Sequence, residues 1–193
     1  MNKAILLKPL LKLLEEIGSI DTTLQNTLAE NFTVEKIKKG KILLREGEVC
    51  KDLWFLADGL LRSFHDIGEK QITSRIMFTN HIVISAGSFF KQTLATESIE
   101  SLSDCILLTL SFTKLQAIYT KHPSFNYHTR IITEDYFFKQ EQRLYMLRKP
   151  SSKDKYAYFI EHYSSYLNDI PVKHIASFLN IARETFSRLR NGK

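Results

Sequence analysis

The sequence IASFLNIARETFSRLR, residues 175–190, combines a regular apolar spacing with a group of charged side chains. In a helix-turn-helix that starts near Val172, five of its residues would lie where the two helices meet, and all five are apolar: Ile175, Leu179, Ile181, Phe186 and Leu189. Ala176 falls where the helices would cross closely, and Asn180 falls in the turn, where a left-handed backbone is needed. The stretch therefore predicts two short helices joined by a tight turn.

The second of these helices, residues 183–190, is predicted to expose Arg183, Glu184 and Arg188. An arginine can pair with two acceptors of guanine, and a glutamate can accept a hydrogen bond from cytosine. The first turn of such a helix enters the major groove of DNA. We therefore expect these three residues to contact bases, and we expect the following residues to contact the DNA backbone: Lys173, Thr185, Ser187 and Arg190. The alternative is a structural helical hairpin with a solvated charged face.

The distribution of charge supports a polyanionic partner such as double-stranded DNA. The chain has 193 residues and a formal net charge of +6. Residues 1–110 carry 13 basic and 14 acidic side chains, whereas residues 111–193 carry 14 basic and 7 acidic ones. All of the excess positive charge therefore lies in the part of the chain that holds the predicted helix-turn-helix.

A long helix is predicted over residues 124–148, after a shorter helix that ends at Pro123. Ile131, Phe138 and Tyr145 recur on it at seven-residue intervals, which favours a dimer interface with a second copy of the helix. Packing against the chain's own β domain is the alternative. The charged residues Glu134 and Glu141 occupy positions at which a regular coiled coil would carry apolar side chains.

Residues 32–110 are typical of an antiparallel β domain. Short apolar stretches alternate there with turns, and the glycines fall at spacings of 7, 12 and 9 residues: Gly40, Gly47, Gly59 and Gly68. Two helices are predicted before this domain, over residues 3–17 and 21–31, the second with Asp21 as its N-cap. A hinge is predicted at Pro150, followed by a helix over about residues 153–167.

Taken together, these motifs resemble the cyclic-AMP receptor protein/FNR (Crp/Fnr) superfamily of bacterial transcription regulators. IARETFSRLR resembles its recognition helix, and KKGKILLREGE followed by LWFLADGLLR resembles the strands of its cyclic-nucleotide-binding β-roll. The resemblance implies an α+β fold with a β-roll sensor domain of jelly-roll type over residues 1–122, a dimerisation helix over 123–149 and a helix-turn-helix domain over 150–193. It also implies a cytoplasmic homodimer that binds a pseudo-palindromic operator, with RNA polymerase as a further partner.

Two departures from the family pattern affect these expectations. The position of the arginine that binds the cyclic phosphate falls on or near Ala95, and Glu97 follows it, so we do not expect cyclic AMP to be the effector. The candidate effector pocket then consists of Ser88, Thr96 and Glu97, with Arg75 or Lys91 as an alternative cation. The second departure is that no β-hairpin wing follows Leu189, which predicts fewer phosphate contacts and a weaker salt dependence.

Other classes of function find little support in the sequence. The two cysteines are too few for an iron–sulfur cluster, and the six histidines lack metal-ligand spacing, so no metal or cofactor is expected; His65 and His81 do not favour haem either. An enzyme is not expected, since no nucleophile–base pairing or P-loop is apparent. No apolar run approaches membrane-spanning length. The alternative function is a ligand-binding or protein-interaction module whose helix-turn-helix does not bind DNA.

Overall fold

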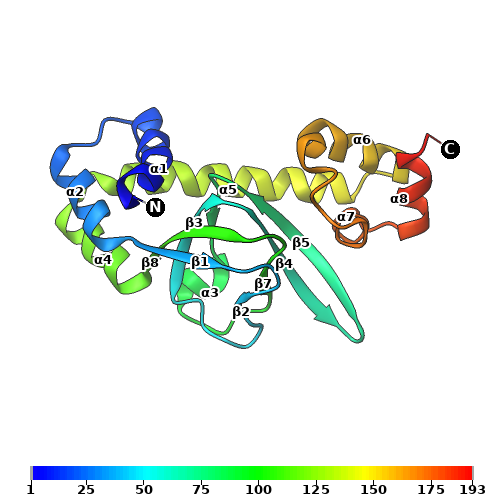
Figure 1. Ribbon diagram of the computed structural model, residues 1–193, viewed down its shortest axis with the longest axis horizontal. Helices are drawn as coiled ribbons and strands as arrows, with labels where there is room; N and C mark the ends of the chain where they lie inside the picture. Colours follow the sequence, from blue (N-terminus) through cyan, green and yellow to red (C-terminus); the bar gives the residue numbers. More distant parts are fainter. Residues whose placement is uncertain (1, 193) are drawn as a thin grey trace. The chain divides into compact units, whose positions relative to one another are not determined.

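The computed structural model describes residues 2–192, and the chain divides into two compact units (Figure 1). Residues 1–63 and 76–133 form the first unit, and residues 64–75 and 134–193 form the second. This grouping differs from the segmentation at residues 122 and 149 that the sequence suggested. The difference arises because the distal part of one β-hairpin, residues 64–75, groups with the C-terminal helices.

The first unit begins with the two predicted helices, α1 (Lys3–Ile17) and α2 (Thr22–Asn31). The side chain of Asp21 accepts a hydrogen bond of 2.7 Å from the backbone N–H of Leu24, which confirms the predicted N-cap. Helix α4 (Phe112–Lys121) follows the β domain, and Ser111 caps it through the backbone N–H of Lys114.

The predicted antiparallel β domain consists, in the described residues, of two four-stranded sheets. One has the order β1-β8-β3-β6 and the other the order β2-β7-β4-β5, with antiparallel pairing between β1 and β8, β3 and β8, β3 and β6, and β2 and β7. The strands are β1 (Thr33–Ile37), β2 (Ile42–Leu44), β3 (Asp52–Asp58), β4 (Leu60–Ile67), β5 (Lys70–Phe78), β6 (Ile82–Val83), β7 (Ser98–Ser101) and β8 (Cys105–Ser111). A short helix that the sequence did not predict, α3 (Ala86–Lys91), lies between β6 and β7.

The core of the first unit lies between the sheets and under α1. Consecutive residues of a strand point to opposite faces, yet Trp54, Phe55 and Leu56 of β3 are all buried, so that strand is covered on both sides. Leu10 and Leu14 of α1 belong to the same buried cluster. In the second sheet, the buried Arg62 of β4 pairs with Glu100 of β7 at 2.5 Å between Nε and Oε1.

The second unit contains the distal β4–β5 hairpin, the C-terminal part of α5 and a cluster of shorter helices. Helix α5 (Phe125–Leu147) confirms the long helix predicted over residues 124–148. Helix α6 (Ser152–Tyr163), with Ser151 as its N-cap, ends earlier than expected and continues as a single 3₁₀ turn, η1 (Ser164–Tyr166). Helices α7 (Val172–Leu179) and α8 (Arg183–Arg190) complete the chain.

Candidate nucleic-acid interface

Helices α7 and α8 form the predicted helix-turn-helix. Asn180 has the left-handed backbone that the turn requires, with φ of 51° and ψ of 53°. The backbone N–H of Asn180 donates to Ser177, and that of Ile181 donates to Ala176, which closes the end of α7. Asparagine tolerates this backbone better than other residues with a side chain, so the local sequence explains the turn.

The apolar side of the helix pair packs on α6. Of the five residues predicted to lie between the helices, Ile175, Leu179 and Phe186 are fully buried, and Ile181 and Leu189 are half-buried. Phe186 of α8 meets the rings of α6 edge to face. The aromatic cluster that joins the three helices consists of Tyr156, Phe159, Tyr163, Phe178 and Phe186. This packing turns the opposite, charged side of α8 outward.

The residues predicted to contact bases lie on that outward side. Arg183, Glu184 and Arg188 are all exposed, and Arg188 lies 3.5 Å from the hydroxyl of Thr185. Within the described residues 2–192, no carboxylate pairs with Arg183 or Arg188. Among residues 2–192, therefore, nothing neutralises the two guanidinium groups, and they present positive charge to an anionic partner.

The residues predicted to contact the DNA backbone flank this group. Lys173 of α7 and Arg190 of α8 are exposed, whereas Thr185 and Ser187 are half-buried. The guanidinium of Arg190 donates to the side-chain oxygen of Asn168 at 2.9 Å. Asn168 was not predicted to lie at this interface, since an asparagine in a loop carries no signal of the helix it will contact.

The residues predicted for a dimer interface lie along α5. Phe138 is 57% exposed and Tyr145 is 68% exposed, whereas Ile131 is half-buried. Two further apolar side chains seven residues apart, Phe137 and Leu144, are also exposed beside them. A helix does not usually leave four large apolar residues in solvent, so this face is suited to contact another protein surface.

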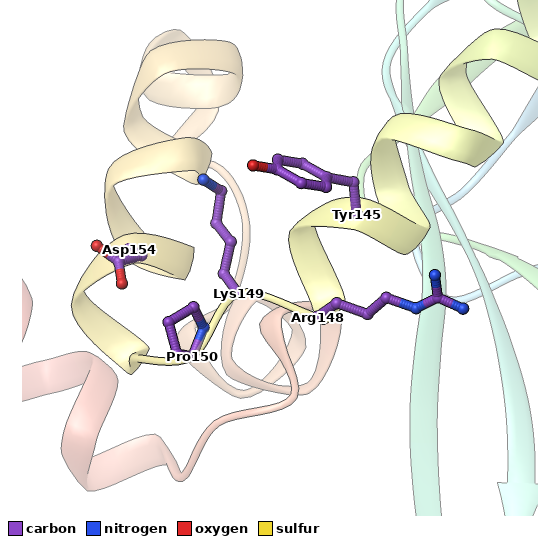
Figure 2. Close-up of a pocket in the computed structure, with 5 residues that line it drawn as sticks. All are labelled: Tyr145, Arg148, Lys149, Pro150 and Asp154. Atoms are coloured by element: carbon purple, nitrogen blue, oxygen red, sulfur yellow. The ribbon is translucent and has the colours of Figure 1, made fainter.

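A shallow cavity of about 250 Å³ lies where α5 gives way to α6, lined by Tyr145, Arg148, Lys149, Pro150 and Asp154. Figure 2 shows that Arg148 extends away from Lys149 and Pro150, so the two cations do not converge on one point. The ammonium of Lys149 instead lies 5.1 Å from the ring centre of Tyr145. A second cavity lies over the turn between β1 and β2, lined by residues 35–41.

The candidate effector residues lie on two segments of the β domain. Ser88 of α3 is buried, and its hydroxyl accepts a 2.8 Å hydrogen bond from the backbone N–H of Cys50 and donates to the carbonyl of Thr93 at 2.5 Å. Burial raises the pKa of the Cys50 thiol, and the charge of Glu97 acts in the same direction. Ser88 thus bonds to the backbone of Cys50, and the charge of Glu97 acts on the thiol of the same residue, whereas Thr96 is exposed.

Ala95, the residue predicted to stand at the position of a phosphate-binding arginine, makes contacts through its backbone. Ala95 is buried, and its N–H and carbonyl exchange hydrogen bonds of 2.8 Å with the turn at Gly47 and Glu48. Of the alternative cations, Arg75 lies over the ring of Tyr136 in the second unit at 5.6 Å, and Lys91 is exposed. Neither of the two cavities described above is lined by Ser88, Thr96 or Glu97.

Within residues 2–192, no three His, Cys, Asp or Glu side chains are grouped so that they could hold a metal ion. None of the helices in this range combines the length and apolar character needed to cross a bilayer.

Comparison with known proteins identifies the fold. Residues 34–122 match the family model of the cyclic nucleotide-binding domain. Among curated protein sequences, none matches this chain.

Three solved structures are similar over most of the chain. FixK2 from Bradyrhizobium japonicum superposes with a TM-score of 0.74 at 13% identity, over 83% of each chain. The c-di-GMP-responsive global regulator CLP from Xanthomonas campestris gives 0.70 at 12% identity, over 89% of this chain and 91% of that one. The catabolite activator protein of Thermus thermophilus gives 0.57 at 17% identity, over 90% and 84%. At these identities the likeness establishes the fold.

Proposed function

We propose that this chain is a transcriptional regulator of the Crp/Fnr type that binds double-stranded DNA through α8. The observation that carries the proposal is the outward face of α8, where Arg183, Glu184 and Arg188 are exposed. This helix follows the tight turn at Asn180 that joins it to α7. This set matches the hydrogen-bonding pattern of guanine and cytosine edges in the major groove. The similar structures support the proposal because they include regulators of gene expression with the same fold.

The regulator acts as a homodimer in this proposal. The exposed apolar face of α5, with Phe138 and Tyr145, is the surface through which two copies associate, and Ile131 extends it. Two recognition helices would then enter successive major grooves about 34 Å apart on a pseudo-palindromic operator. RNA polymerase is the further partner that such a regulator implies.

The effector, if the protein has one, is not cyclic AMP in this proposal. Ala95 offers no cation to a phosphate, and the carboxylate of Glu97 would repel one. The candidate effector site at Ser88, Thr96 and Glu97 therefore suits a neutral molecule better than an anion. No cofactor is assigned.

The proposal is tested by selecting bound duplexes from a random library at about 150 mM salt. We expect enrichment of a two-fold-symmetric motif with half-sites one helical turn apart. Arg188→Ala should then weaken binding to that motif by about 1–3 kcal/mol and relax the preference at one base pair. Arg45→Ala, which removes an exposed arginine from the β domain, is the matched control and should change neither.

Two results would contradict base recognition. Absence of enrichment by the wild type would favour the second candidate, a ligand-binding or protein-interaction module. Equal losses for Arg188→Ala on the selected and on a scrambled duplex would reduce Arg188 to a phosphate contact.

A further inference from the structure

The hydroxyl of Ser177 joins α7 to strand β5. It accepts a hydrogen bond of 2.9 Å from the backbone N–H of Thr73 and donates one of 3.1 Å to the carbonyl of Gln71. All three residues belong to the second unit. One side chain of the helix-turn-helix thus bonds to two backbone groups of the β-hairpin, although about a hundred residues separate them in the sequence.

The two backbone groups are those that a further strand would use. They flank Ile72, so in a pleated strand they point to the same side. Among the described residues, β5 is the last strand in the order β2-β7-β4-β5. Because a hydroxyl can donate and accept at once, Ser177 binds both groups as a neighbouring strand would.

Arg143 of α5 adds a second connection at the same place. Its Nε donates to the carbonyl of Ser74 at 3.2 Å, and its guanidinium lies 3.7 Å from the ring centre of Phe178, the residue after Ser177. Burial lowers the pKa of Arg143 to about 10, so the environment is partly desolvated. In such an environment both the hydrogen bond and the cation–π contact are strengthened.

These contacts bear on α8 because α7 and α8 share a short turn and pack on the same residue of α6. The turn at Asn180 is three residues from Ser177, and Phe178 and Phe186 both pack on Phe159 of α6. A change in the tilt of α7 would therefore change the direction in which α8 presents its side chains. Strand β5 continues to Phe78 in the first unit, so the strand that binds α7 belongs to a sheet of the β domain.

We propose that Ser177 is a positioning residue for DNA recognition. By bonding to Gln71 and Thr73 of β5, it fixes the orientation from which α8 presents Arg183, Glu184 and Arg188 to an operator. The inference rests on the proposed function, and it adds that one hydroxyl outside the recognition helix determines the spacing of half-sites that the dimer accepts.

The test compares Ser177→Ala with Ser177→Thr, which keeps the hydroxyl, and with Ser165→Ala, which removes an exposed hydroxyl from η1. Binding is measured to the selected operator, to a single half-site, and to operators lengthened or shortened by one base pair. The wild type should lose at least about tenfold in affinity per base pair of altered spacing, and Ser177→Ala less than about threefold, since one base pair displaces a half-site by about 3.4 Å. Single half-site binding should be unchanged, which a general loss of folding would not allow.

Hydrogen exchange provides a readout without DNA. The Thr73 amide should exchange at least about tenfold faster in Ser177→Ala than in the wild type, with amides between β3 and β8 unaffected. Ser177→Thr and Ser165→Ala should behave as the wild type in both measurements.

The outcomes separate the two proposals. A wild type that binds no duplex overturns the proposed function and this inference with it. A wild type that binds DNA, with Ser177→Ala retaining its spacing preference or its slow Thr73 exchange, overturns this inference alone. Failure of Ser177→Thr to restore the wild-type behaviour also overturns it, because the hydroxyl would then not be the cause.

Discussion

At the scale of single residues, Tyr163 shows how the helical unit responds to pH. Burial raises the pKa of Tyr163 to about 12, against about 10 for a free tyrosine. The unfolded chain therefore loses this proton at lower pH than the folded chain. By linkage, the stabilisation from Tyr163 is complete below pH 10 and is lost as the pH rises toward 12.

We predict that replacing Tyr163 by Phe removes this dependence. Between pH 9 and pH 11, the free energy of unfolding of the wild type should fall by about 1 kcal/mol relative to Tyr163→Phe, at 1.36 kcal/mol per pKa unit. Urea unfolding at several pH values measures it. In an absorbance titration of the eight tyrosines, the ionisation step at the highest pH should be absent from the variant. A loss of absorbance from the main tyrosinate step, with the last step retained, would show that Tyr163 titrates with the others.

Gly59, between β3 and β4, is a second residue whose identity the structure explains. It has φ of +111°, and an added Cβ would lie 2.6 Å from the sulfur of Cys105 and 2.7 Å from the carbonyl oxygen of Asp104. Both strain and steric overlap therefore exclude a side chain. Gly40 has φ of +82°, but nothing lies within 4 Å of the position of its Cβ.

The pair of glycines allows a matched comparison. Gly59→Ala should lower the free energy of unfolding by at least about 3 kcal/mol, because backbone strain and overpacking add. Gly40→Ala should lower it by only about 1–2 kcal/mol, the cost of the left-handed backbone alone. Denaturant unfolding of both variants measures the difference. Equal losses would mean that the strands move apart to admit the methyl group.

At the scale of elements, the turn between α7 and α8 depends on one backbone conformation. We predict that Asn180→Gly leaves stability within about 0.5 kcal/mol of the wild type, because glycine adopts positive φ readily. Asn180→Val should cost about 1–2 kcal/mol, because a β-branched residue is strained there. Thermal unfolding monitored by circular dichroism separates the two variants. A stable Asn180→Val protein would imply a different turn in solution.

The sequence of an element does not always predict what it contacts. For α7, the apolar spacing of Ile175, Ala176 and Leu179 predicted the packing on α8. It did not predict the contact of Ser177 with β5, because that contact is to backbone groups, which have no sequence signature. The same reason explains why Arg143 was not singled out: nothing in the pattern of α5 distinguishes it from a solvated arginine.

At the scale of the whole molecule, the exposed face of α5 is the feature that one chain leaves unexplained. We predict that Phe138→Glu combined with Tyr145→Glu converts the proposed homodimer to a monomer, because two negative charges in each copy would face their counterparts across the interface. Sedimentation equilibrium measures the dissociation constant, which should rise at least about 100-fold. Ile5→Glu, which alters an exposed apolar residue of α1, is the control and should leave the association unchanged.

This prediction is contradicted if the double variant is still a dimer at the protein concentration at which the wild type is a dimer. The proposed homodimer itself is contradicted if the wild type is a monomer at micromolar concentration. In that case the exposed side chains of α5 would face another partner or another part of this chain.

Local patterns in the sequence were sufficient for most of the elements, though not for α3: the 3.6-residue period of the helices, the glycine spacing of the β domain, the cap at Asp21 and the left-handed turn at Asn180. These follow from interactions between residues near in the chain, which the sequence displays directly. Only the tertiary structure decided that Ser177 and Arg143 contact residues 71–74, that Asn168 contacts Arg190, and that Ser88 and Glu97 lie near Cys50. Such contacts join distant residues through single hydrogen bonds or charges, and a sequence carries no record of which distant groups the fold will bring together.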